Sequence, residues 1–388
     1  MGTRSGPLAG TKVLDISSVI MGPYATAILG DLGADVIKIE MPGGDVGRNL
    51  GPSRNSGMSA LTLNLQRNKS SVVLDPKTDE GRAYFEELIR GCDAVVTNLR
   101  PKSRERLGIS YEQLQRLNPS AVLCSGQAYS SSSELADEPA YDDIVQAASG
   151  LCDLYRRVDG EPRYAPYVVA DKVCGLTMVQ GLLAALVHRE RTGEGQWVDV
   201  PMVDTMLAFN LVEHLSGQTF VPPAGPIGWN RTLVAERRPH RAKDGWVCLM
   251  PYSDRNWQDF FTLVDRAELR DDPRFSSNGA RHTHMADLQS ILAEITPIRT
   301  VAEWQELCRS ADIPIQEVLD LDDLDASEYA RSRQTLRRRT HPSEGDYLSV
   351  RFPIDFSRTP ADTSRPAPRL GEHTGRRWTT TATAEVGR

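Results

Sequence analysis

Asp171 is the only acidic residue in an apolar stretch, residues 167–186, that has the composition of a buried helix. The apolar residues from Val173 to Leu186 leave almost no polar face, which is typical of a helix that is packed on most sides. Gly175 and Gly181 lower helix propensity, so they predict close packing against another backbone. Basic residues followed by Gly193 predict the carboxyl end of the helix.

Two roles for Asp171 are compatible with a place at the beginning of this helix. The first is an N-cap, which accepts a hydrogen bond from a free backbone N–H group of the first turn. The second is a carboxylate nucleophile, ionised and close to N–H donors that can stabilise a developing oxyanion. The rest of the chain has to decide between them.

Length and composition restrict the class of protein. A chain of 388 residues predicts two lobes with substantial cores, and 40% apolar with 25% charged residues is ordinary for a soluble globular protein. A net charge of −7 argues against a general nucleic-acid binder. The six cysteines are widely spaced without a C-x-x-C motif, which indicates reduced thiols in a cytoplasmic protein.

No targeting or membrane segment is expected. The amino terminus has no apolar signal-peptide region. Lys172, Gln180 and His188 interrupt the apolar helix, so we expect no run of membrane-spanning length.

Predicted strands and helices alternate through the first half of the chain. The strands are residues 12–16, 35–40, 71–74, 94–98, 121–125 and 197–200, and the helices are residues 25–32, 78–89, 111–117, 141–150 and 201–215. Residues 42–68 are rich in Gly, Pro, Ser and Asn and predict a long surface loop. The alternation predicts an α/β fold with a mostly parallel sheet, and ligands of such sheets bind beyond the carboxyl ends of the strands.

The first βαβ unit does not predict dinucleotide binding. Glu40 ends its second strand, where a ribose-binding acid would stand. The turn after the first strand has no G-x-G-x-x-G motif, and that motif is what lets a pyrophosphate approach the backbone.

A second lobe is expected after residue 216. Residues 217–240 shift to Gly, Pro and aromatic residues, and a strand at 246–250 and helices at 255–264, 285–295 and 301–310 follow. We therefore predict a large domain of residues 1–216, completed by residues 330–388, and a small domain of residues 217–329.

The segment Arg237–Arg241 either holds a phosphate or a substrate carboxylate or is a solvated loop. His282 and His284 lack a third ligand nearby, which argues against a metal site. The basic run 331–339 has no interleaved aromatic residues and predicts a solvated surface.

A series of short motifs, taken in order, resembles the class III CoA-transferases, the family of formyl-CoA transferase, carnitine CoA-transferase and α-methylacyl-CoA racemase. The resemblance covers nearly the whole chain. The motifs are Leu8-x-Gly10-x-x-Val13-Leu-Asp15, Gly22-Pro23, residues 29–40, Asn68-Lys-Ser70, Leu74-Asp-x-Lys77, Asn98-x-x-Pro101, Arg106-Leu-Gly108, Leu117-Asn-Pro119, residues 181–186, Thr192-Gly-x-Gly-Gln196, Met202-x-Asp204 and Leu370-Gly-Glu-His-Thr374.

The resemblance implies a Rossmann-like large domain, a smaller α+β domain and a homodimer of interlocked chains. It implies that Asp171 is the nucleophile and that Tyr141 lies beside the reacting thioester. Lys77 and Arg106 are expected near the adenosine phosphates. The positions expected to hold CoA are Val19, Leu74, Asp75, Pro76, Lys77, Asn98, Leu99, Arg106 and Leu107, together with Tyr141.

The implied activity moves CoA from an acyl-CoA to a small carboxylic acid through an aspartyl anhydride and an aspartyl-CoA thioester. Such covalent catalysis divides one difficult exchange into easier steps. It requires no metal or redox cofactor and no partner other than the second subunit, so we expect neither nucleic acid nor membrane to be bound.

Two alternatives remain. A racemase would need two acid–base groups that flank the α-carbon, and its histidine is replaced by Tyr141 in Ala140-Tyr-Asp142. An ordinary tyrosine pKa of about 10 suits proton abstraction at neutral pH poorly, whereas a histidine pKa of about 6.5 suits it well. The other alternative is a CoA-binding protein without activity.

Two departures from formyl-CoA transferases disfavour oxalate as the acceptor. Ile20 stands where those enzymes have a glutamine, and the loop Ala224–Gly228 is much shorter than their glycine-rich lid.

Overall fold

The computed structural model describes residues 5–378, which divide into two compact units. The first unit contains residues 5–149, 164–209 and 333–378, and the second contains residues 150–163 and 210–332. These bounds differ from the predicted domains because residues 150–163, 210–216 and 330–332 group with the second unit. One contact within that unit is a hydrogen bond of Arg157 to the carbonyl oxygen of Ile227.

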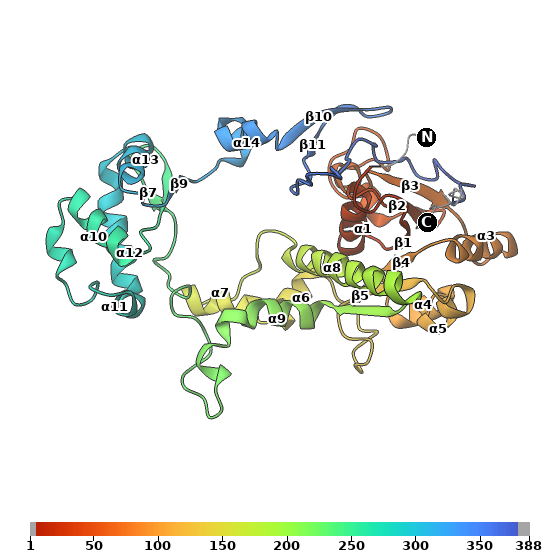
Figure 1. Ribbon diagram of the computed structural model, residues 1–388, viewed down its shortest axis with the longest axis horizontal. Coiled ribbons are helices and arrows are strands. Elements are labelled where there is room, and N and C mark those ends of the chain that lie inside the picture. Colours follow the sequence, from red (N-terminus) through yellow and green to blue (C-terminus); the bar gives the residue numbers. More distant parts are fainter. Residues whose placement is uncertain (1–4, 379–388) are drawn as a thin grey trace, which may run out of the picture. The chain divides into compact units, whose positions relative to one another are not determined.

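The first unit is built on a six-stranded sheet in the order β3-β2-β1-β4-β5-β6, in which all neighbouring strands are parallel (Figure 1). This is the doubly wound order, and the strand order reverses between β1 and β4. The α/β prediction with a parallel sheet is confirmed. The strands are β1 (Lys12–Ile16), β2 (Asp35–Glu40), β3 (Lys69–Val73), β4 (Ala94–Thr97), β5 (Val122–Gln127) and β6 (Trp197–Pro201).

Helices cover both faces of this sheet. On one face, Leu14, Ile37 and Val95 of the strands pack against α3 (Asp79–Arg90), α4 (Pro101–Leu107) and α5 (Tyr111–Leu117). On the other face lie α1 (Met21–Asp31) and α8 (Val169–Thr192), which pack against each other. The unit also contains η1 (Val46–Asn49), α2 (Ala60–Leu65), α6 (Asp142–Ala148) and most of α9 (Met202–His214).

The carboxyl-terminal part of the chain completes the first unit. It contains a hairpin of β10 (Leu336–His341) and β11 (Gly345–Val350). The backbone N–H of His373 donates to the carbonyl of Ser71 at 2.9 Å, and Arg376 pairs with Asp35 at 2.8 Å. Residues more than 300 positions apart therefore lie side by side along β2 and β3.

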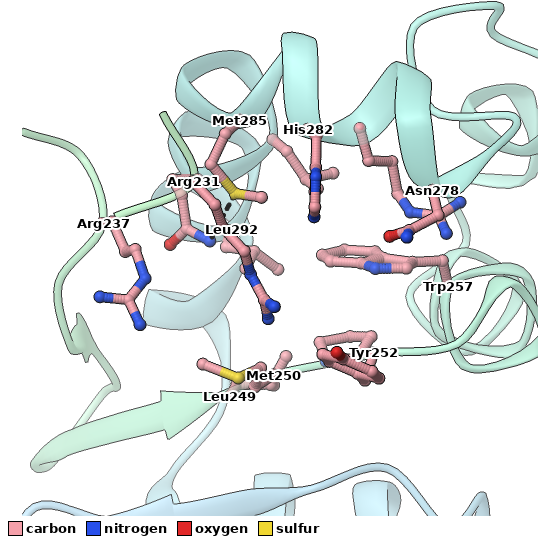
Figure 2. Close-up of a pocket in the computed structure, with 14 residues that line it drawn as sticks. Arg231, Arg237, Leu249, Met250, Tyr252, Trp257, Asn278, His282, Met285 and Leu292 are labelled. Carbon is pink, nitrogen blue, oxygen red and sulfur yellow. Dashed lines mark hydrogen bonds between the residues drawn. The ribbon is translucent and has the colours of Figure 1, made fainter. Parts of the chain in front are cut away.

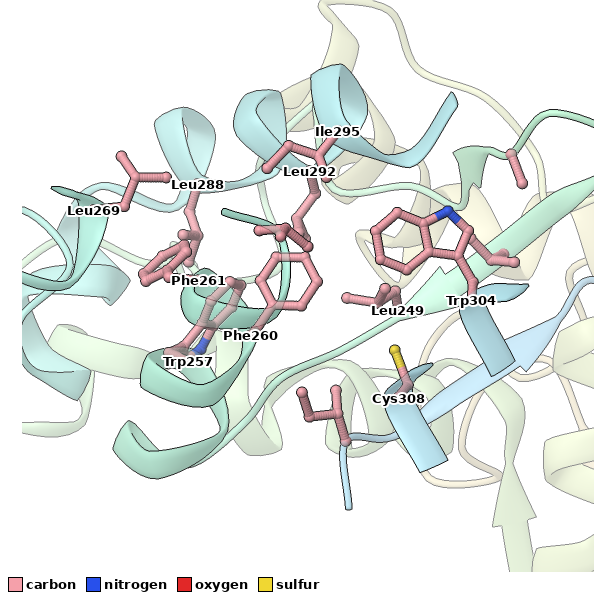
Figure 3. Close-up of a cluster of buried hydrophobic side chains, with 14 of the residues drawn as sticks. Leu249, Trp257, Phe260, Phe261, Leu269, Leu288, Leu292, Ile295, Trp304 and Cys308 are labelled. Atoms are coloured by element: carbon pink, nitrogen blue, oxygen red, sulfur yellow. The ribbon is translucent and has the colours of Figure 1, made fainter. Parts of the chain in front are cut away.

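The second unit is a small α+β body. Its three-stranded antiparallel sheet contains β7 (His240–Arg241), β8 (Trp246–Leu249) and β9 (Ile315–Glu317). Its core gathers the rings of Trp257, Phe260, Phe261 and Trp304 (Figure 3). The helices are α7 (Leu151–Asp159), α10 (Asp254–Leu263), α11 (Asn278–Thr283), α12 (Met285–Ile295), α13 (Val301–Ser310) and α14 (Glu328–Arg333), with η2 (Ser216–Thr219), η3 (Ala267–Arg270), η4 (Thr296–Ile298) and η5 (Leu321–Ala326).

Five short helices were not predicted from the sequence: α2, α4, α7, α11 and α14. Each has six to nine residues, too short for a clear hydrophobic period, and each depends on tertiary packing for its stability. Helix α2 lies inside the segment that we expected to be entirely loop, where the side chain of Ser59 caps its amino end.

Helix α8 corrects the expectation that no segment reaches membrane-spanning length. Its 24 residues are long and apolar enough to cross a membrane by length and composition, even with Lys172, Gln180 and His188. In the structure it packs against α1, β5 and β6, and half of its most apolar window is buried. These contacts are those of a core helix.

Candidate active site

Asp171 is the third residue of α8, and it does not cap the helix. The residue before the helix, Val168, makes no side-chain capping hydrogen bond. The cap comes instead from Asp142, whose Oδ1 accepts a 2.8 Å hydrogen bond from the backbone N–H of Asp171. The N-cap interpretation of Asp171 is therefore wrong. Within residues 5–378 no hydrogen bond or ion pair engages the Asp171 carboxylate itself.

Asp142 is fixed in place by its own neighbours. It is the first residue of α6 and is buried. Its Oδ2 accepts a 2.5 Å hydrogen bond from Gln146 Nε2, and Gln146 Oε1 accepts one from the N–H of Ala165 at 2.9 Å. The start of α6 and the segment that leads into α8 are thereby joined around one carboxylate.

The environment of Asp171 shifts its titration to neutral pH. Burial first, and the nearby charge of Asp142 second, raise the pKa of Asp171 to about 7. Both causes disfavour the ionised form because the carboxylate loses water and faces another acid. A carboxylate that ionises under these conditions is poorly solvated and correspondingly basic, as a nucleophile or a general base must be.

Glycine 175 brings α8 against the beginning of α1. A methyl group at Gly175 would lie 2.9 Å from the carbonyl oxygen of Met21, so the predicted backbone approach is confirmed there. At Gly181 the close neighbour is the Val198 side chain, at 2.8 Å, and not a backbone. Asp171 precedes Gly175 by one turn on the same face of α8. It therefore lies on the face of α8 that meets the beginning of α1, where the first N–H groups have no partner within the helix.

The turn between β1 and α1 is held in an unusual conformation. Val19 has a φ of 69°, in the left-handed region that a β-branched residue rarely adopts. Its N–H donates to Asp45 Oδ1 at 3.1 Å. The side chain of Asn98, just after β4, accepts from the N–H of Ser18 at 2.9 Å and donates to the Ser18 carbonyl at 2.8 Å. Val19 and Asn98 thus lie together where the strand order reverses, the usual ligand site of such sheets.

A buried ionic network stabilises this turn through hydrogen bonds to its carbonyl oxygens. Lys69 pairs with Asp15 at 3.0 Å and donates to the Pro23 carbonyl at 2.9 Å. Lys38 pairs with Asp45 at 3.0 Å and donates to the Ser17 carbonyl at 2.7 Å. Burial lowers the pKa of Lys69 to about 8. Although burial opposes it, the charges of Lys38 and Lys69 hold the pKa of Asp15 well below its usual range.

Glu40 has a structural partner that explains why it is not a ribose-binding acid. It is buried, pairs with Arg48 at 2.6 Å and accepts a hydrogen bond from the Ser71 hydroxyl. Its carboxylate is therefore already occupied by groups of the protein.

The other predicted CoA positions lie along the carboxyl ends of the strands or just beyond them. After β3, Leu74 and Pro76 are buried, Asp75 is half-buried and Lys77 is exposed. After β4, Leu99 is half-buried, and like Leu107 of α4 it packs against the core cluster of that face. The buried aliphatic side chains among these residues stabilise the fold. Their backbone groups and the exposed cation Lys77 are therefore the groups that can contact a ligand.

Arg106 and Tyr141 lie at the surface. Arg106 lies in the last turn of α4 and borders a shallow depression that also contains Arg82 and Arg116. Tyr141 immediately precedes α6 and is 78% exposed, so its ring does not fill the core. Within residues 5–378 there is no cluster of His, Cys, Asp or Glu with the arrangement of a metal site.

Two polar residues of this region were not singled out from the sequence. For Asp142 the sequence gives a signal, because an acid that directly follows a loop is typical of a helix start, but nothing in it indicates that Asp142 caps a different helix. For Arg104 it gives none, because its burial and its contacts, with Gln127 at 3.1 Å and over the Trp197 ring at 5.4 Å, arise only from the fold.

Comparison with known proteins extends over nearly the whole chain. The family profile described as CoA-transferase family III matches residues 8–374. The succinate–glutarate CoA-transferase of Agrobacterium fabrum is 31% identical over 96% of this chain and 95% of its own length. The acetyl-CoA:oxalate CoA-transferase of Acetobacter aceti is 33% identical over 95% of this chain and 94% of its own length.

Solved structures agree with this match. A CAIB/BAIF family protein from Brucella suis superposes with a TM-score of 0.80 at 28% identity, covering 96% of this chain and 98% of that protein. Rv3272 from Mycobacterium tuberculosis superposes with a TM-score of 0.81 at 26% identity, covering 96% and 99%. The chain therefore belongs to CoA-transferase family III and is an enzyme that transfers CoA between an acyl-CoA and a carboxylic acid.

Proposed function

We propose that Asp171 is the nucleophile of this transferase. The observation that carries the proposal is a carboxylate with a pKa of about 7 at the head of α8, which forms no hydrogen bond or ion pair within residues 5–378. A structural acid would have a cation or a hydrogen-bond donor to neutralise it, and Gly175, one turn along α8, lies against the beginning of α1.

The reaction then proceeds in balanced steps. An Asp171 oxygen attacks the thioester carbonyl, the C–S bond breaks, and a mixed anhydride and CoA thiolate form. The thiolate attacks the Asp171 carbonyl carbon, which releases the donor acid and leaves aspartyl-CoA. The acceptor carboxylate attacks this thioester to give a second anhydride, and the thiolate attacks its acceptor carbonyl, which frees Asp171 and the new acyl-CoA. Each oxyanion formed in these attacks requires nearby N–H donors, which the first turns of two helices supply.

CoA is proposed to lie along the carboxyl edge of the sheet. The strained turn at Val19 and the Asn98 side chain mark the point where the strand order reverses. Lys77 and Arg106 are exposed cations that can meet the adenosine phosphates, and Tyr141 is exposed beside the acid that caps α8. No metal or redox cofactor is needed for these steps.

The acceptor is proposed to be a small dicarboxylic acid. The relatives named above carry succinate, glutarate or oxalate in their names. Incubation of the protein with succinyl-CoA, acetyl-CoA or formyl-CoA and each free dicarboxylic acid, followed by mass spectrometry, tests the assignment. A peptide that contains Asp171 and carries CoA after donor addition would identify the intermediate. Failure of all donors to give CoA exchange would contradict the proposed substrates, and a CoA adduct on another residue would contradict the nucleophile.

A racemase remains the second candidate because a carboxyl with a pKa of about 7 also suits proton transfer. A 2-methylacyl-CoA in deuterated buffer without free acid separates the two. We expect no deuterium at the α-carbon, and enzyme-dependent uptake would favour racemisation.

We further propose that two chains form an interlocked homodimer. Helix α8 is apolar on nearly every side, yet Leu176 and Val187 are about half exposed, and on α9 Val212 is 85% exposed. Apolar surface of this kind on a single chain is typical of a subunit interface. Sedimentation should give a dimer at micromolar concentration, and a folded monomer would refute the interlocked arrangement.

A further inference from the structure

The second unit contains a pocket with cationic and apolar walls and no acid among its lining residues. The lining side chains come from the loop before β7, from the end of β8 and the loop after it, and from α10, α11 and α12 (Figure 2). Nothing in the proposed reaction uses this pocket. Arg231 and Arg237 supply its charge, and leucine, methionine and tryptophan side chains supply its apolar surface.

Arg231 is oriented by aromatic rings and not by a carboxylate. Its guanidinium lies 4.9 Å from the ring centre of Tyr252 and 5.7 Å from that of Trp229. Such contacts are attractions between the cation and the ring and occupy no hydrogen-bond acceptor of the protein, and the guanidinium has five N–H donors in one plane. Within residues 5–378 its guanidinium forms no ion pair or hydrogen bond, so these donors are available to a ligand.

Arg237 adds a second uncompensated charge. It is exposed, and its guanidinium likewise has no carboxylate partner within the described residues. Arg281, in the wall of the same pocket, behaves differently. It is buried, donates to the Phe275 carbonyl at 2.8 Å and pairs with Asp254, so its charge is neutralised by the protein.

The structure also divides the basic segment Arg237–Arg241. Arg237 borders the pocket, whereas His240 bonds Gln289 Oε1 at 3.1 Å and Arg241 stacks over the Trp246 ring at 5.4 Å. Arg241 does not line the pocket, and it therefore provides a matched arginine for comparison.

The remainder of the pocket suits an apolar group. Leu249, Trp257, Leu288 and Leu292 belong to the core of the unit, and Met250 and Met285 add flexible apolar surface. The amide of Gln289 is already used, because its Nε2 contacts Met285 Sδ at 3.6 Å and its Oε1 bonds His240. A ligand would thus find apolar contacts and two cations.

We propose that this pocket binds an organic carboxylate that carries a short apolar body. The planar donors of Arg231 match the two oxygens of a carboxylate, Arg237 adds attraction, and the apolar body lies against Met250 and the Tyr252 ring, which are not buried. The proposal does not rest on the nucleophile, since binding at this pocket requires neither acyl-CoA nor Asp171.

The test is binding to the full-length protein without CoA, measured by calorimetry. The probes are hexanoate and phenylacetate, their neutral amides, and adenosine 3′,5′-bisphosphate as a phosphate of the size found in CoA. We expect the carboxylates to bind and the amides to bind at least about tenfold more weakly, because a tenfold change corresponds to about 1.4 kcal/mol and a charge-assisted hydrogen bond contributes at least that much.

Three variants locate the binding. Arg231→Gln and Arg237→Gln should each weaken carboxylate binding by about tenfold, whereas Arg241→Gln, which removes an equal charge outside the pocket, should leave it unchanged. A loss of binding in Arg237→Gln cannot be attributed to misfolding, because Arg237 is exposed and its side chain forms no hydrogen bond or ion pair within the described residues. Equal binding of acids and amides, equal loss in Arg241→Gln, no effect of either pocket variant, or binding of the bisphosphate alone would each overturn the proposal.

Discussion

The backbone N–H of Asp171 donates a 2.8 Å hydrogen bond to the carboxylate of Asp142, so the acid that caps α8 is supplied by a different helix. This arrangement leaves the Asp171 side chain without a structural partner and places a second negative charge beside it. One contact therefore both positions the candidate nucleophile and, after burial, raises its pKa to about 7.

Replacing Asp171 with asparagine should abolish CoA exchange and preserve CoA binding. Asparagine keeps the shape of the side chain but provides no carboxylate to form an anhydride. Exchange of CoA into a labelled acid and calorimetry with CoA measure the two properties. The exposed neighbour Asp143→Asn serves as the control. Exchange at the rate of the unaltered protein would contradict the assignment.

The exchange rate should fall as the pH decreases below about 7, because protonation removes the nucleophilic form of Asp171. Asp142→Asn should move this acidic limb to lower pH, since it removes the like charge while its amide oxygen can still accept the N–H of Asp171. The measurement is kcat/KM as a function of pH, with Asp143→Asn as the matched control. An identical limb in Asp142→Asn would show that the two carboxyls are not coupled.

Asp171→Asn should stabilise the protein above pH 7. The folded state raises the pKa of Asp171 from 3.8 to about 7, so it binds the proton more tightly than the unfolded chain does. Stability from this group is therefore present at low pH and is lost as the pH rises through about 7. Thermal unfolding should show a gain on the order of 1 kcal/mol at pH 8, after allowance for solvent screening, and almost none at pH 4. A gain at pH 4 and none at pH 8 would reverse the sign of this argument.

Charge reversal at Lys77 or Arg106 should weaken CoA binding by about tenfold or more without lowering the melting temperature. Both side chains are exposed cations and contribute little to the core. Loss of an ionic hydrogen bond to phosphate is worth about 1.5–3 kcal/mol. Arg309→Glu, an exposed arginine of the second unit, provides the comparison by calorimetry. Unchanged affinity in a variant would remove that residue from the CoA site.

Asp15→Leu should destabilise the first unit by about 3–5 kcal/mol, because it leaves Lys69 buried without its carboxylate. Asp15→Leu combined with Lys69→Met should recover part of this loss, since both charges are then absent. Denaturant unfolding of the two single variants and the double variant measures the coupling. Strictly additive losses would show that the pair contributes no interaction of its own.

The sequence alone determined the class of fold and the position of Asp171 near the beginning of an apolar helix. The alternation of apolar strands with amphipathic helices predicted the parallel sheet, because the two periodicities are local properties of the chain. The bounds of β1, β2, α5, α12 and α13 were predicted to the residue, and those of the other elements that were predicted to within a few residues, whereas β7, β9, β10 and β11 were not predicted. Asp171 was identified as the candidate nucleophile because acids are uncommon in apolar helices and because its surroundings matched a family motif.

Tertiary structure decided what each charged residue does. The sequence could not reveal that Asp142 caps α8 or that Arg48 forms an ion pair with Glu40. It also could not reveal that Arg104 is buried and lies over the Trp197 ring. Nor could it distinguish Arg237, which borders a pocket, from Arg241, four residues further along the chain, which stacks on the ring of Trp246. The reason is physical: a side chain's hydration and charged neighbours come from segments distant in the chain, and these set its pKa and its partners.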